Sequence, residues 1–229
     1  MCEHLKPVNK TLFNLISEKR DSKESLFFIG RTFMKDLLYE SACIFNNLIK
    51  SEIVFVLGRK GKSLEVKLIF HETDFFHLAG LHKIDDISLI KGKAKDVFEA
   101  ILQKRLTYKD IENSTKIDSV NERLHIIKSL IAIFSQENNY FKFLKKVIPY
   151  SQIKWKYLIS FSYNEIDGYI FLEEYRDKKG DFLCRSCFNR GKLAYEQRQI
   201  KYTLLQVIMK NEIGEKQELF KSNSYKTNI

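Results

Sequence analysis

The sequence is short of cysteine and of long apolar runs, and each shortage excludes a class of protein. Its four cysteines are too few and too scattered for a disulfide framework; they are Cys2, Cys43, Cys184 and Cys187. No stretch approaches the roughly 18 uninterrupted apolar residues of a membrane span. The opening Met-Cys-Glu-His-Leu-Lys lacks the apolar core of a signal peptide. We therefore expect a cytoplasmic protein with no membrane partner.

The chain also has no glycine-rich phosphate loop, no alternation of strands and helices, no internal repeat and no low-complexity linker. The absence of a phosphate loop and of strand–helix alternation argues against a parallel α/β sheet. The absence of a repeat and of a linker argues for one main domain.

What is present is enough apolar surface for a core and an excess of positive charge. Hydrophobic residues make up 44% of the 229 residues, with 18 Phe and 11 Tyr. The 39 Lys and Arg against 29 Asp and Glu give a formal net charge of +10. This balance favours a polyanionic partner such as nucleic acid or an anionic surface, although a soluble protein that is simply basic is the alternative.

Hydrophobic periodicity predicts an α+β fold made of N-terminal helices, a β-hairpin, a helical insertion and an antiparallel β-meander. Gly58-Arg59-Lys60-Gly61 is expected to turn the hairpin. Ser119 and Glu122 fit a capping box at the start of the last helix. The predicted helices cover residues 10–20, 31–50, 93–106 and about 119–134, and the predicted strands cover 53–57, 64–70, 153–161, 169–174, 182–188 and 199–210.

We expect three segments along the chain. Residues 1–30 form a helical extension, residues 31–210 form the main α+β domain, and residues 211–229 form a polar tail that frays.

The stretch from Leu64 to Lys83 combines a strand with a short helix that ends at Gly80, and it contains Phe75-Phe76-His77-Leu78-Ala79-Gly80. A hydrophobic strand followed by this F-x-H-L-[TA]-G pattern resembles the opening of a phage-type Barnase–EndoU–colicin–RelE-like nuclease domain, specifically the fourth family of that group. Ala79 stands where threonine is expected. The late strand Cys184-Arg185-Ser186-Cys187-Phe188 and the long last strand agree with the resemblance, which covers about residues 31–210.

The resemblance implies an endoribonuclease or a ribonuclease-like toxin or effector that acts on RNA without a metal or other cofactor. Attack by the ribose 2′-hydroxyl would leave a 2′,3′-cyclic phosphate, and an antitoxin or immunity protein is a possible partner. His77 suits proton transfer near neutral pH, and Arg185 with Ser186 suits the developing negative charge. By periodicity alone, His77 between Phe76 and Leu78 also fits a buried core histidine.

Arg185 and Ser186 point to opposite faces of a regular strand, so both reach one site only at a strand end or a bulge. Further candidates would bind the substrate phosphates or bases, or would be ordinary surface residues. They are Lys67, His82, Lys83, Tyr195, Arg198 and Lys201.

A metal site has little support in the sequence. Cys184-x-x-Cys187 has no second pair of ligands at zinc spacing, and His71, His77 and His82 match no single helical face. Neighbouring carboxylates such as Glu173 and Glu174 would diverge on a strand, which disfavours a two-metal nuclease or a glycosidase.

Two non-catalytic hypotheses remain open. One is a binding factor of phage or mobile-element origin, for which we expect a broad basic face with exposed Trp155 or tyrosines and no role for His77. The other is an inhibitor whose positive charge binds an acidic protein, which steeply salt-dependent nucleic-acid binding would contradict.

Overall fold

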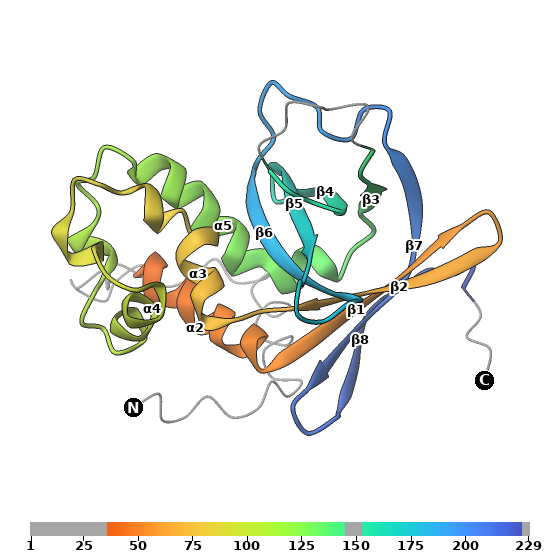
Figure 1. The fold of residues 1–229 in the computed structure, drawn as a ribbon, viewed down its shortest axis with the longest axis horizontal. Coiled ribbons are helices and arrows are strands. Elements are labelled where there is room, and N and C mark those ends of the chain that lie inside the picture. Colours follow the sequence, from red (N-terminus) through yellow and green to blue (C-terminus); the bar gives the residue numbers. More distant parts are fainter. Residues whose placement is uncertain (1–35, 145–152, 226–229) are drawn as a thin grey trace, which may run out of the picture. The chain divides into compact units, whose positions relative to one another are not determined.

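The computed structural model describes residues 36–144 and 153–225, all within the second of two units of the chain, Asp36–Ile229. The helix predicted at residues 10–20 lies outside the described residues. Within them the fold is α+β, as predicted, with helices gathered on one side of a strongly curved sheet (Figure 1). No helix in this part of the chain is both long and apolar enough to cross a membrane.

The described residues form four α-helices and three 3₁₀ turns, which precede most of the strands. Asp36 caps the helix that begins at Leu37, because its carboxylate accepts a hydrogen bond from the Tyr39 backbone N–H at 2.9 Å. The predicted Ser119 capping box is wrong, since the last helix begins two residues earlier, after Lys116, with no side-chain cap. The helices are α2 (Leu37–Ile49), α3 (Glu72–Leu78), α4 (Ala94–Leu102) and α5 (Ile117–Phe134), and the turns are η2 (Leu81–Lys83), η3 (Ser88–Ile90) and η4 (Tyr108–Asp110).

The described strands form one sheet, in which seven close into a ring. The ring order is β1-β2-β6-β5-β4-β3-β7 and back to β1, while β8 pairs only with β7, outside the ring. The predicted hairpin is confirmed, with Arg59 opposite Lys62 at its tip. The strands are β1 (Ser51–Arg59), β2 (Lys62–Ile69), β3 (Asn139–Lys142), β4 (Tyr157–Tyr163), β5 (Ile166–Glu174), β6 (Asp181–Asn189), β7 (Ile200–Asn211) and β8 (Lys216–Lys221).

The order of strands differs from the predicted antiparallel meander in two ways. β4, β5 and β6 are consecutive and antiparallel as expected, but β6 then pairs in parallel with β2 rather than with the next strand. β7 pairs instead with β1 and β3. The physical reason is closure: a ring satisfies the backbone groups of both edges of the meander, which a flat sheet would leave unpaired.

The prediction that the chain frays after residue 211 is wrong for β8. Its residues Leu219 and Phe220 are partly buried against the main core, although the rest of the strand is exposed. Two apolar side chains on an otherwise polar strand are a weak sequence signal, and the strand is held by its pairing with β7.

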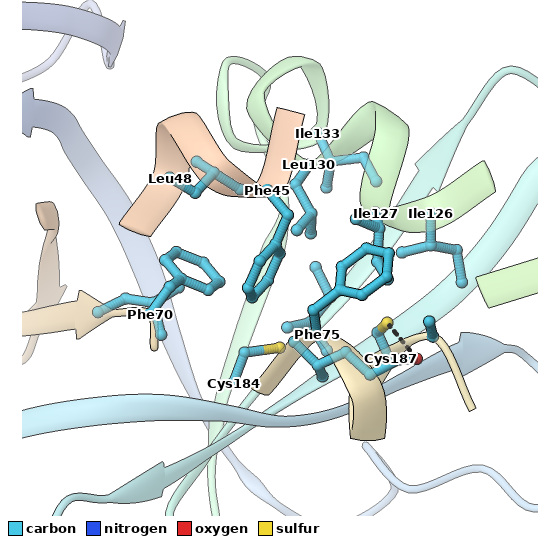
Figure 2. Close-up of a cluster of buried hydrophobic side chains, with 14 of the residues drawn as sticks. Phe45, Leu48, Phe70, Phe75, Ile126, Ile127, Leu130, Ile133, Cys184 and Cys187 are labelled. Atoms are coloured by element: carbon cyan, nitrogen blue, oxygen red, sulfur yellow. Dashed lines mark hydrogen bonds between the residues drawn. The ribbon is translucent and has the colours of Figure 1, made fainter. Parts of the chain in front are cut away.

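The main core lies between the helices and the inner face of the sheet. Phe45 of α2 contacts Phe70, Phe75 and Phe98, with ring centroids 5.3, 5.4 and 6.0 Å away. Figure 2 shows that Cys184 of β6 lies in this cluster, close to Phe75 of α3, with the apolar residues of α5 on the other side of the aromatic rings. The same packing that buries the aromatic rings therefore fixes α3 against β6.

Candidate active site

The candidate site begins with α3, whose two ends are set by local chemistry. At the start, the Asp74 carboxylate accepts a hydrogen bond from the His71 backbone N–H at 2.8 Å. At the end, Gly80 adopts a left-handed φ of 77°, as predicted from the sequence. Phe75 and Leu78 are buried, so the intervening His77 points away from the core and is exposed. The alternative of a buried core histidine is therefore wrong.

His77 lies beside a second imidazole. The rings of His77 and His82 have centroids 5.1 Å apart, and Phe76 packs near both, at 5.7 and 6.4 Å. Burial lowers the pKa of His82, and the nearby His77, Arg123 and Lys83 lower it further. The turn after Gly80 thus places beside His77 an imidazole that is neutral over a wider pH range.

The β6 strand carries a bulge at the position where the sequence required one. Phe171 of β5 is opposite Ser186 and Leu172 is opposite Cys184, so Arg185 is the extra residue. Cys184 and Cys187 both point to the core, whereas the Arg185 side chain is 60% exposed. The Arg185 guanidinium is not free, because its Nε lies 3.4 Å from Glu173 Oε2.

The two sequence motifs meet where α3 packs against β6. The Cys187 thiol donates a long hydrogen bond, 3.9 Å, to the Leu78 carbonyl, and this contact is the dashed line in Figure 2. Each partner is the direct chain neighbour of a predicted catalytic residue, Ser186 in one case and His77 in the other. This contact joins the backbone of α3 to β6 beside both residues, but Ser186 itself is opposite Phe171, whose side chain lies on the other face of the sheet from Cys187.

Asp74 is a site residue that the sequence analysis missed. Burial raises the pKa of its carboxyl, while the His71 backbone N–H and the charges of His71, His77 and Arg185 act in the opposite direction. In the sequence Asp74 is an acidic residue near the start of a short helix, and its hydrogen bond to the His71 backbone fits that position. Its electrostatic coupling to His77 and Arg185 needed the fold to be seen.

A second missed residue is Arg123 of α5, which is only 7% exposed. Its Nη1 donates to the Leu78 carbonyl at 3.4 Å, and its guanidinium carbon lies 5.7 Å from the centre of the Phe188 ring. In the sequence Arg123 occupies an ordinary polar position of an amphipathic helix. Its burial comes from α3 and β6, which are distant along the chain.

The predicted substrate-binding residues divide into two groups. His82 and Lys83 lie at the site, and burial, followed by the charge of Arg123, lowers the pKa of Lys83. Lys67 instead pairs with Glu52 at 2.6 Å and Asp181 at 3.7 Å, on β2.

The remaining three lie on or before β7, which pairs with β1 and β3 and not with β6. Lys201 is opposite Phe141, and Arg198 is exposed at a left-handed φ of 56°. The Tyr195 ring reaches β6 but packs against Phe188 and Phe171 on the outer face of the sheet.

Three further observations bear on the other hypotheses. In the described part of the chain, no three His, Cys, Asp or Glu residues gather as a metal site. Burial raises the pKa of Cys187 to about 11 and raises that of Cys184 well above its ordinary value, so both thiols are held protonated. Trp155 is only 5% exposed, which removes the exposed tryptophan expected of a binding factor.

The family model of the phage-Barnase-EndoU-ColicinE5/D-RelE like nuclease 4 matches residues 37–227. The chain belongs to this nuclease family. The match covers α2 through β8 and so includes the His77 turn, the β6 bulge and Arg123. No curated protein and no solved structure matches the chain. Membership in this family implies that the substrate is a nucleic acid.

Proposed function

We propose that the domain is an endoribonuclease that cleaves RNA without a metal ion and leaves a 2′,3′-cyclic phosphate. The observation that carries this proposal is the pair of imidazoles, His77 and His82, whose centroids are 5.1 Å apart. Cleavage by a ribose 2′-hydroxyl needs one group that takes the hydroxyl proton and another that protonates the leaving 5′-oxygen. Two histidines supply both groups near neutral pH.

The environments of the two histidines suggest their roles. The lowered pKa of His82 favours the neutral imidazole, which accepts the 2′-hydroxyl proton. His77, which like His82 is exposed, would donate a proton to the 5′-oxygen, and Asp74 lies near it. The oxygen of the 2′-hydroxyl forms the new bond to phosphorus as the bond to the 5′-oxygen breaks. Arg185 and Ser186, on the bulge of β6, would donate hydrogen bonds to the phosphate.

The test is cleavage of a labelled structured RNA and of a tRNA pool in excess EDTA, with analysis of the product ends. We expect cutting that survives EDTA and leaves a cyclic phosphate. His77→Ala and His82→Ala should each lower the rate about 10²- to 10⁴-fold, because each removes one proton-transfer group.

His125→Ala is the matched control, since it removes an exposed imidazole from α5. Cutting that requires a divalent metal would refute the mechanism. If no variant cuts and salt-sensitive RNA binding is unchanged by His77→Ala, the domain is a binding factor instead.

A further inference from the structure

Arg123 is a buried charge with no counter-charge among the described residues. No carboxylate of that part of the chain lies within 4 Å of it, and its Nε is buried without a hydrogen-bond partner. The guanidinium makes one hydrogen bond to the described residues, of 3.4 Å, at the long end of the useful range. An isolated buried charge is costly, and buried arginines are normally paired.

The surroundings of Arg123 add positive charge instead of neutralising it. The guanidinium lowers the pKa of both His82 and Lys83, which directly follow the Gly80 turn. Gly80 itself lies against the arginine side chain, since a Cβ there would be 2.9 Å from Cδ and 3.3 Å from Nε. Phe188 covers the guanidinium from the β6 side. Three elements thus hold a cation next to the paired imidazoles.

A structural role is the competing explanation. The Leu78 carbonyl belongs to the last turn of α3, where a cation is favourable, and the Phe188 ring adds a cation–π contact. Both contacts are weak compared with the desolvation of a guanidinium, and they leave the buried Nε without a hydrogen bond to the described residues. An anion would supply the missing partner.

We infer that Arg123 binds a phosphate group, with Lys83 beside it, and that it holds the scissile phosphodiester next to His77 and His82. The identity of this anion rests on the proposed function. Arg185, exposed and paired with Glu173, is then an outer contact, and Arg123 is the main cation that faces the phosphate oxygens. The interaction of the buried Arg123 with a phosphate is stronger than that of the exposed Arg185, because water is largely excluded around Arg123.

The first test uses inorganic phosphate as the probe and needs no activity. Thermal unfolding is measured in phosphate and in chloride at equal ionic strength, for the wild type, Arg123→Met and Lys128→Gln. Phosphate should raise the midpoint of the wild type, because it binds the folded state. Arg123→Met should abolish that rise while leaving the midpoint in chloride unchanged or higher, because an apolar side chain replaces an unpaired buried charge.

Lys128→Gln is the control, since it removes one positive charge from the exposed face of α5. It should keep the phosphate effect. A variant Arg123→Met that fails to fold, or that is less stable in chloride, would show that the residue is structural and would overturn the inference. The same holds if the variant keeps the phosphate effect.

The second test separates this inference from the proposed function. In the EDTA cleavage assay, Arg123→Lys and Arg123→Gln should lower kcat/KM about 10²- to 10³-fold, as loss of a transition-state donor does. If the wild type does not cut RNA but Arg123→Met loses phosphate binding, the anion site stands and the ribonuclease proposal fails. If the wild type cuts and the Arg123 variants cut equally well, the inference fails and the ribonuclease proposal stands.

Discussion

Burial and the neighbouring His77 act on the imidazole of His82 in the same direction, and both lower its pKa. We expect His77→Gln to raise the pKa of His82, because it removes a neighbouring positive charge, but not to the ordinary value, because burial is the larger cause. A titration of the imidazole resonances by NMR measures this directly. An unchanged pKa would show that the two rings do not interact.

The same shift makes a prediction for stability. The folded pKa lies below the unfolded value of about 6.5, so the unfolded chain binds more protons between the two values. The contribution of His82 to the free energy of unfolding is therefore present above the unfolded pKa. It is lost as the pH falls through the folded pKa. Between about pH 7.5 and about pH 5.5, His82→Gln should lose less free energy of unfolding than the wild type in urea titrations. His125→Gln, on the exposed face of α5, is the control, and an equal change in both variants would contradict the prediction.

At the scale of elements, the end of α3 depends on Gly80 for two reasons, its left-handed backbone and its contact with Arg123. Gly61 has a similar φ of 73° at the hairpin tip but has no atom within 4 Å of an added Cβ. Gly61→Ala should therefore cost only the backbone strain, about 1–2 kcal/mol. Gly80→Ala should cost more in urea unfolding and should also reduce phosphate binding, because the new Cβ displaces the Arg123 side chain. If Gly61→Ala and Gly80→Ala lower the free energy of unfolding equally, the contact of Gly80 with Arg123 does not affect stability.

At the scale of the whole molecule, the net charge of +10 predicts salt-dependent RNA binding. The tip of the β1–β2 hairpin exposes Arg59 and Lys60, and Arg59 lies 5.9 Å from the centre of the Tyr202 ring. With His77→Ala as background to prevent cleavage, Arg59→Gln/Lys60→Gln should reduce the slope of log affinity against log salt by about 1.4, if both residues contact phosphates of a single strand. Lys216→Gln/Lys221→Gln on β8 is the control pair. The same loss in both double variants would show that only total charge matters.

The elements were predictable where local chemistry decides them. The apolar stripe of α5, the hairpin tip and the left-handed Gly80 follow from periodicity and turn chemistry, and all three are confirmed. The parallel pairing of β2 with β6 was not predictable, because it joins strands separated by about half of the chain and leaves no trace in either strand's own pattern.

The candidate site was also predictable only in part. Its two sequence motifs were found from the residues, and a bulge was one of two arrangements, with a strand end, that would let Arg185 and Ser186 share a site. The partners of those motifs were not found. Arg123 and Asp74 have ordinary positions in their own helices, and only the packing of α3 against α5 and β6 changes their electrostatic surroundings.

The closure of the ring through β1 and β7 also determines when during synthesis its strands can pair. One edge of β1 pairs at once with β2, but its other edge pairs with β7, with Ser51 opposite Asn211, so that edge stays unpaired until almost the whole domain has been synthesised. Such distant contacts form late, because a long loop must first be closed. The scaffold of the candidate site is therefore complete only once β7 has emerged from the ribosome, and a chain that stops before Ile200 leaves the ring open.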